Sequence, residues 1–127
     1  MRKQNSKGRL ICKRAEKCLD GAARVTCSVG EMYLTLLESS EEVKWFRCLV
    51  PLEHIDQFVV TKRQSCELCS DFLVSFQDGH LGIRECVKRE VLNTPRVKGM
   101  LSISKEYWAA RGINDWKIVT ERSDEDE

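Results

Sequence analysis

The fold is decided by the stretch Phe72-Leu73-Val74-Ser75-Phe76-Gln77-Asp78-Gly79-His80-Leu81-Gly82-Ile83-Arg84-Glu85-Cys86-Val87. An Asp-Gly pair between two runs of alternating apolar residues predicts a β-hairpin, because both residues tolerate the positive φ angles of a tight turn. Side chains alternate between the two faces of a strand. A two-residue turn therefore places five side chains on one face: Phe72, Val74, Phe76, Leu81 and Ile83. The other face is expected to carry Ser75, Gln77, Gly82 and Arg84.

Alternating apolar residues predict further strands elsewhere, over residues 25–29, 32–36, 43–50, 55–61 and 116–120. Residues 10–19 fit either a helix or a short first strand. The segment Asn93-Thr94-Pro95 breaks the strand pattern, and Ser104 is a suitable N-cap for a short helix that ends before Gly112. Trp108 on this helix is expected to face the core.

The length of 127 residues predicts one domain, over residues 9–120. Residues 1–8 are basic and residues 121–127 are acidic, and both ends are expected to be disordered. Neither a membrane-spanning apolar run nor a signal peptide is recognisable. Seven cysteines in a chain without such a signal indicate reduced thiols and a cytoplasmic or nuclear location.

Six or seven strands followed by a helix predict a mainly β, α+β fold, as a twisted antiparallel sheet or a partly open barrel or sandwich capped by a short C-terminal helix. The strand order, the segment Val50-Pro51-Leu52-Glu53-His54-Ile55, the Asp-Gly hairpin and the helical Trp108 resemble a pleckstrin-homology-like domain over residues 24–112. The chain departs from that superfamily in its shorter helix and in a last strand that follows the helix. The resemblance implies a groove between a sheet edge and the helix, where an extended peptide adds a strand.

Three cysteines and one histidine have the spacing of zinc ligands: Cys66, Cys69, His80 and Cys86. The hairpin excludes this set, because six extended residues separate His80 from Cys86 by roughly 20 Å at ~3.3 Å per residue. No metal or other cofactor is therefore expected. If a metal is bound, its candidate ligands are Cys66, Cys69 and Cys86, which lie near the base of the hairpin with Cys86 opposite Asp71.

No catalytic signature is recognisable, since the chain has no nucleophile elbow, phosphate-binding loop or dinucleotide turn, and we interpret the protein as non-catalytic. Basic residues of the N-terminal third are the candidate contacts for a partner or an anion: Arg2, Lys3, Lys7, Arg9, Lys13, Arg14, Lys17 and Arg24. Ser123 precedes three acidic residues, as in sites of acid-directed kinases, and is a candidate for phosphorylation.

Two functions are compatible with these patterns. The first is an intracellular adaptor module that recruits a protein or peptide partner. The alternative is a nucleic-acid- or phospholipid-binding protein that acts through its basic N-terminal third, with weak phosphate contacts by the disordered arm. Salt dependence separates the two functions, because phosphate contacts weaken steeply with ionic strength.

Overall fold

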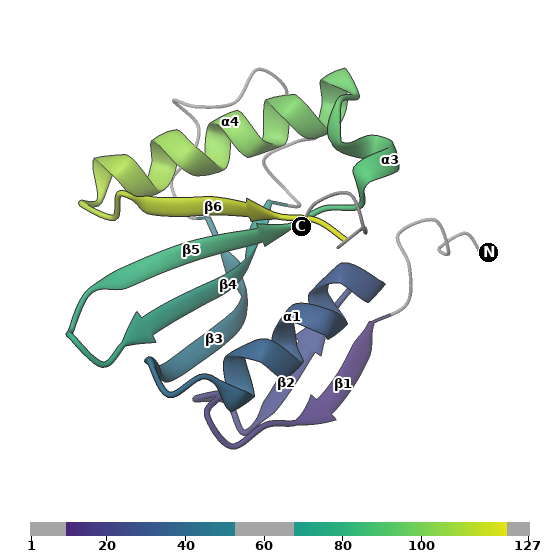
Figure 1. Cartoon of the computed structure of the whole chain (residues 1–127). Coiled ribbons are helices and arrows are strands. Elements are labelled where there is room, and N and C mark those ends of the chain that lie inside the picture. Colours follow the sequence, from purple (N-terminus) through teal and green to yellow (C-terminus); the bar gives the residue numbers. More distant parts are fainter. Residues whose placement is uncertain (1–9, 53–67, 122–127) are drawn as a thin grey trace.

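The computed structural model describes residues 10–52 and 68–121. These residues form a β-rich α+β domain with two sheets, neither of which closes into a barrel within the described part of the chain (Figure 1). The larger sheet has the strand order β3 (Val43–Pro51), β4 (Cys69–Phe76), β5 (Leu81–Cys86) and β6 (Asp115–Val119). The smaller sheet is a hairpin of β1 (Ile11–Arg14) and β2 (Ala22–Val25). The helices are α1 (Ser28–Ser39), α3 (Arg89–Leu92) and α4 (Pro95–Ala110).

The last strand makes the larger sheet a mixed one. β3, β4 and β5 are antiparallel neighbours, whereas β6 lies parallel to β5. Parallel neighbours need a crossover connection, and α4 supplies it. The antiparallel sheet predicted from the sequence is therefore wrong for β6, because this strand follows the crossover helix and returns in the direction of β5.

The predicted β4–β5 hairpin is present, but its register differs by one residue from the prediction. Ser75 pairs with Leu81, and the Phe76 N–H donates to the His80 carbonyl oxygen at 3.0 Å. The loop therefore has three residues and ends at Gly79, whose φ is 97°. Three-residue hairpin loops with a left-handed glycine are a common alternative to the two-residue turn.

A one-residue change of register moves every side chain of a strand to the opposite face. The faces predicted for β5 are therefore wrong. Gly82 pairs with Val74 and Arg84 with Phe72, so Gly82 and Arg84 join the face of these two apolar residues. Ile83 lies on the other face and packs with the residues of α4.

Residues 28–39 form a helix where strands were predicted. The structure buries Val29, Leu34 and Leu37, which lie on one side of a helix, and it leaves Leu36 exposed. The alternation of Met32, Leu34 and Leu36 predicted a strand, and this prediction is wrong. The apolar residues of this segment reach the core with the spacing of a helix. Residues 10–19 fitted either a helix or a short first strand, and the structure has the strand β1 there. The strand predicted at 55–61 lies outside the described residues.

Helix α4 is longer than the predicted C-terminal helix. Thr94 is its N-cap, with the Thr94 hydroxyl accepting from the Val97 N–H at 3.4 Å, and Pro95 occupies the first turn. Proline is favoured in the first turn of a helix, so this segment begins α4. Ser104, predicted as the N-cap, is a buried residue in the middle of the helix. Within the described ranges, none of the helices is long and apolar enough to cross a membrane.

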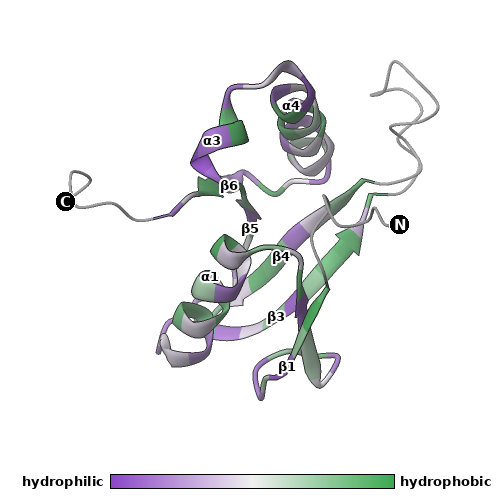
Figure 2. Ribbon diagram, turned by 90° about the vertical axis from the view of Figure 1, so that its right-hand side faces the viewer, coloured by the Kyte–Doolittle hydropathy of each residue, from purple (hydrophilic) through white to green (hydrophobic). Residues whose placement is uncertain are grey.

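Both faces of the larger sheet are covered, and a hydrophobic core lies on each (Figure 1). The core beneath α1 and the β1–β2 hairpin contains the fully buried Phe46 and Phe72. The core beneath α4 contains Ile83, Ile103 and Trp108. Figure 2 shows hydrophobic residues along β3 and β4, between these two layers. The burial of Trp108 confirms that it faces the core.

Candidate functional site

A half-buried carboxyl group, that of Asp71, and a buried one, that of Glu85, lie side by side at one end of the larger sheet. β4 begins and β5 ends there, which brings Asp71 next to Glu85 and Cys86. The Asp71 N–H donates to Glu85 Oε1 at 3.1 Å, and the Cys86 N–H donates to Asp71 Oδ2 at 2.8 Å. The sequence placed Cys86 opposite Asp71, but the observed register continues to Asp71 opposite Glu85, and Cys86 reaches Asp71 only through the bond to its side chain.

The two carboxyl groups compete for negative charge. Burial and the neighbouring Glu85 raise the pKa of Asp71 to about 7. Burial also raises the pKa of Glu85, although hydrogen bonds from Ser104, Ser70 and the Asp71 backbone oppose that rise. Two carboxyl groups this close to each other are both ionised readily only when a cation lies beside them. Strongly perturbed pairs of this kind are typical of functional sites.

Residues from β2 and α1 lie around this end of the sheet. Burial and the charges of Asp71 and Glu85 raise the pKa of the Cys69 thiol, and the Arg24 charge is close enough to oppose that rise. The first turn of α1 also reaches this end, since Cys27 Sγ lies 3.9 Å from the Cys86 carbonyl oxygen. The start of α1 therefore lies near the carboxyl pair.

Two further charged residues belong to the segments that reach this end of the sheet. Glu31 follows Cys27 by one turn of α1 and pairs with Lys13 at 2.8 Å. Lys88 lies two residues after the end of β5, is exposed, and is the N-cap of α3.

The structure describes two of the three cysteines predicted as candidate metal ligands. Cys66 lies outside the described residues, and Cys69 is exposed. Cys86 is buried, and burial holds its pKa well above the ordinary range of a thiol, whereas a metal ligand must be a thiolate. In the described part of the chain, no three His, Cys, Asp or Glu side chains converge to hold a metal ion.

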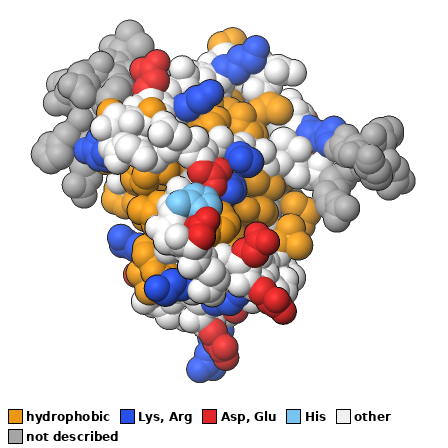
Figure 3. All heavy atoms as spheres, turned by 60° about the vertical axis from the view of Figure 1, so that its left-hand side comes forward, with side chains coloured by type: hydrophobic (Ala, Val, Ile, Leu, Met, Phe, Trp, Pro, Cys, Tyr) orange, Lys and Arg blue, Asp and Glu red, His pale blue; other side chains and the backbone are white. Residues whose placement is uncertain are grey.

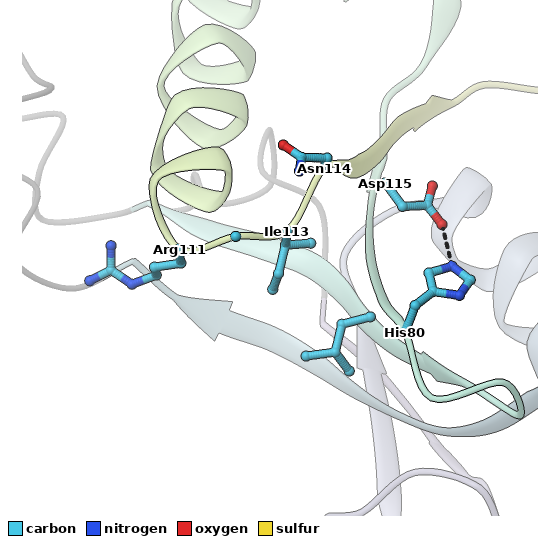
Figure 4. A pocket seen from close by; sticks show the side chains of 7 residues that line it. His80, Arg111, Ile113, Asn114 and Asp115 are labelled. Carbon is cyan, nitrogen blue, oxygen red and sulfur yellow. Dashed lines mark hydrogen bonds and ion pairs between the residues drawn. The ribbon is translucent and has the colours of Figure 1, made fainter.

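A pocket of about 440 Å³ lies at the opposite end of the sheet (Figure 4). It is lined by the start of β5 and by the loop between α4 and β6. His80 stacks on Phe76, with 4.5 Å between the ring centroids. Its Nδ1 lies 2.6 Å from Asp78 Oδ1, and its Nε2 lies 2.9 Å from Asp115 Oδ2. Figure 3 shows acidic side chains beside a histidine on this face of the protein.

Asp115 is the centre of an ion-pair network beside this pocket. Its two carboxylate oxygens accept from Arg84 at 2.9 and 3.1 Å, and Lys117 Nζ lies 3.1 Å from Oδ1. The hydrogen bonds from Arg84, followed by those from His80 and Lys117, hold the pKa of Asp115 well below its usual range. Because both oxygens of Asp115 serve to tie β6 to β5, we interpret this network as structural.

His80 is expected to titrate above the ordinary histidine pKa of about 6.5, because its hydrogen bonds to Asp115 and Asp78 raise its pKa. A raised pKa in the folded state means that protonated His80 stabilises the fold. This contribution is fully present below the unfolded-state pKa and is lost as the pH rises through the folded-state pKa. NMR titration of the His80 ring, with His54→Gln to assign the signals, measures it. A pKa at or below the ordinary value would contradict the bridge to the two carboxylates.

The basic residues predicted as contacts are only partly placed by the structure. Four of them and the candidate phosphorylation site lie outside the described residues: Arg2, Lys3, Lys7, Arg9 and Ser123. Lys13 forms an ion pair with Glu31, and Lys17 Nζ donates to the Ser40 carbonyl oxygen. Arg14 and Arg24 are exposed on the β1–β2 hairpin.

The sequence analysis missed the carboxyl pair. The pattern that could have identified it is the presence of two acidic residues at the predicted base of the hairpin, Asp71 and Glu85. A scan of known protein families finds no match, and a search of curated proteins finds no significant relative.

Proposed function

We propose that this protein is a divalent-metal-dependent phosphodiester hydrolase that acts on nucleic acid, with its reaction centre at Asp71. The observation that carries the proposal is the pair of half-buried Asp71 and buried Glu85, in which the pKa of Asp71 is raised to about 7. A divalent cation resolves the competition for charge between two such groups. The proposal differs from the non-catalytic function expected from the sequence, which stays an untested prediction.

A hard cation such as Mg²⁺ or Mn²⁺ would take one carboxylate, that of Asp71, from the described side chains at this end of the sheet. Mg²⁺ commonly binds one or two protein carboxylates, keeps several water molecules, and takes further oxygens from substrate phosphates. It therefore does not need three converging side chains. Asp71 supplies a carboxylate that the Cys86 N–H holds in place. The Glu31 carboxylate of α1 is paired with Lys13 at 2.8 Å and is not assigned to the cation.

A bound divalent cation would activate water and stabilise negative charge on a phosphoryl group. The protein's own contribution is to place the carboxylates and to bind the phosphate. The exposed cationic side chains that could bind phosphate oxygens here are Arg24, whose charge acts on the Cys69 thiol, and Lys88, two residues after β5.

Nucleic acid is the substrate that the exposed basic residues favour. They occur on the β1–β2 hairpin and on the segment from the end of β5 to the first turn of α4, and include Arg14, Arg24, Lys88, Arg96 and Lys98. Side chains of this kind bind the sugar–phosphate backbone without reading sequence. The proposal thus adds a catalytic centre at Asp71 to the nucleic-acid binding that was predicted, as the alternative function, from the basic N-terminal third.

Asp71→Asn is expected to abolish the reaction, with at least a ~100-fold loss of turnover, because an amide replaces the charged ligand that we assign to the cation. Cleavage of supercoiled and linear DNA and of RNA would be measured with Mg²⁺ or Mn²⁺ and with EDTA. Glu90→Gln removes an exposed carboxylate of α3 and is the matched control. Cleavage that persists in EDTA or in Asp71→Asn would contradict the proposal, as would a wild-type protein that cleaves none of these substrates.

A peptide-binding adaptor is the second candidate, and one observation favours it. β6 is an edge strand of the larger sheet, and its Ile118 is 40% exposed, so a peptide has an accessible edge to extend. The pleckstrin-homology-like groove belongs to this second hypothesis. For either function we propose a cytoplasmic or nuclear location, since the described cysteines are all free thiols.

A further inference from the structure

We infer that the acidic segment of residues 122–127 binds a basic surface of its own chain and competes there with nucleic acid. The basic surface consists of the exposed cationic side chains between the end of β5 and the first turn of α4, which are Lys88, Arg96 and Lys98. The inference rests on the proposed function only for the binding of nucleic acid to this surface. It does not depend on a metal ion or on a reaction at Asp71.

The residue before the acidic segment, Glu121, is held beside α3. The Arg89 N–H donates to Glu121 Oε1 at 2.7 Å, and Arg89 Nε donates to the Glu121 carbonyl oxygen at 3.1 Å. The Val87 N–H donates to the Val119 carbonyl oxygen at 2.9 Å, so the chain after β5 and the end of β6 run side by side up to this point (Figure 1). Residues 122–127 therefore leave the described structure next to the basic surface.

The charges at this attachment point already favour an acidic group. The hydrogen bond from the Arg89 N–H, together with the charges of Arg89 and Lys88, holds the pKa of Glu121 below its usual range. Lys88 is thus close enough to Glu121 for its charge to act on the carboxylate. The acidic segment begins one residue later, where the same positive charges attract it.

The basic surface and the acidic segment are complementary in charge. Residues 88–98 include four basic residues and one acidic residue, Glu90, whereas residues 122–127 include four acidic residues and one basic residue. Within the described part of the chain, neither Arg96 nor Lys98 forms an ion pair. The first turn of α4 also contains no acidic residue that could neutralise them. These two side chains are therefore left to pair with carboxylates of the segment or with phosphates.

Residues 122–127 are long enough to cover the basic surface. Six residues extend up to about 20 Å at ~3.3–3.6 Å per residue. α3 has four residues, or about 6 Å at ~1.5 Å per residue, and α4 begins after two more residues. A short tether holds the segment near the surface at an effective concentration of the order of millimolar. Because exposed ion pairs are individually weak and are screened by salt, the contact lowers the affinity for nucleic acid severalfold without abolishing it.

The test compares the wild-type chain with the variant Glu125→Gln/Glu127→Gln. The matched control is Glu41→Gln/Glu42→Gln, which removes the same number of charges by the same substitution. Both control residues are exposed in the turn after α1, and the Glu42 carbonyl oxygen accepts from the Gln77 N–H at 2.8 Å, at the opposite end of the larger sheet.

Binding of a fluorescein-labelled DNA duplex would be measured by anisotropy in EDTA, at about 50 and 200 mM salt. Glu125→Gln/Glu127→Gln is expected to bind DNA about two- to fivefold more tightly than the wild type at the lower salt concentration, because two competing charges are removed. At the higher concentration the two proteins should differ little. The control should change the affinity less than ~1.5-fold, because its charges lie far from the basic surface.

NMR detects the contact in the absence of DNA. The amide chemical shifts of residues 88–98 are expected to differ between the wild type and Glu125→Gln/Glu127→Gln. These differences should disappear at about 500 mM salt, where charges are screened beyond roughly 4 Å. Differences that grow with protein concentration would place the segment on a second copy of the chain and would overturn the inference.

The possible results separate this inference from the proposed function. If the shifts of residues 88–98 change but the wild type and the variant both fail to bind DNA, the contact is confirmed, and the nucleic-acid function is wrong together with the competition. If the wild type binds DNA and neither the shifts nor the affinity change in the variant, the inference is wrong and the proposed function is unaffected. An equal gain of affinity in the control would also overturn the inference, because the effect would then follow net charge.

Discussion

Trp108→Ala is expected to lower the free energy of unfolding by about 3–5 kcal/mol, which is a large share of the stability of a small domain. The side chain is 7% exposed and lies in the core between the sheet and α4. It packs edge-to-face on Tyr107, with 4.9 Å between ring centroids, and donates to Ser70 Oγ at 2.8 Å. The substitution therefore removes apolar packing and leaves a buried serine without its donor.

Equilibrium urea denaturation followed by circular dichroism measures this effect. Trp108→Phe is the matched variant, since it keeps most of the packing and loses only the indole N–H, and it should cost about 1–2 kcal/mol. Trp45→Phe, at a half-buried position of β3, is expected to cost less than Trp108→Ala. A loss below about 1 kcal/mol in Trp108→Ala would show that α4 does not pack on the sheet through this residue.

Asp115→Ala is expected to destabilise the protein by roughly 3–5 kcal/mol, because it leaves the Arg84 guanidinium buried without its carboxylate. The Arg84 side chain is 9% exposed and that of Asp115 is 21% exposed. Their paired hydrogen bonds cross from β5 to the parallel β6, so hydrogen exchange should accelerate along residues 115–119 before the rest of the sheet.

The double variant Arg84→Met with Asp115→Ala is the informative control. Replacing both members of a buried ion pair by apolar groups is often neutral, so the double variant should recover much of the stability that the single variant loses. The pKa of Asp115 is depressed in the folded state, so the stabilisation is present above the ordinary aspartate pKa of about 3.9 and is lost as the pH falls below it. A single variant as stable as the wild type would contradict this assignment.

Local sequence patterns identified the parts of the fold that depend on neighbouring residues. The alternation in residues 43–50 and around Asp78-Gly79 identified β3, β4 and β5, because each strand buries every second side chain. The same pattern did not determine the hairpin register. Two- and three-residue loops can both place a glycine at the turn, and only the packing of Arg84 beside Phe72 distinguishes them.

Features that depend on distant contacts were not predictable in this way. Met32 and Leu34 alternate as in a strand but also fit a helix. The helix face that they share with Val29 can be recognised only when it is packed against the sheet. The parallel pairing of β6 depends on the path of α4 over the sheet, which no short motif records. Asp71 and Glu85 are 14 residues apart. Their contact depends on the observed register, which differs by one residue from the predicted one, and the hydrogen bonds to Glu85 come from Ser70 of β4 and Ser104 of α4.

The parallel pairing of β6 also determines when the domain can be completed during synthesis. β3, β4 and β5 can pair as soon as they leave the ribosome, but β5 has no partner on its second side until α4 and residues 115–119 have followed. Strand pairings between segments separated by a crossover form slowly, and an open strand edge invites pairing with other chains. A nascent or truncated chain that lacks β6 would therefore present the edge of β5 to its neighbours, so the same strand that completes the sheet also protects it from aggregation.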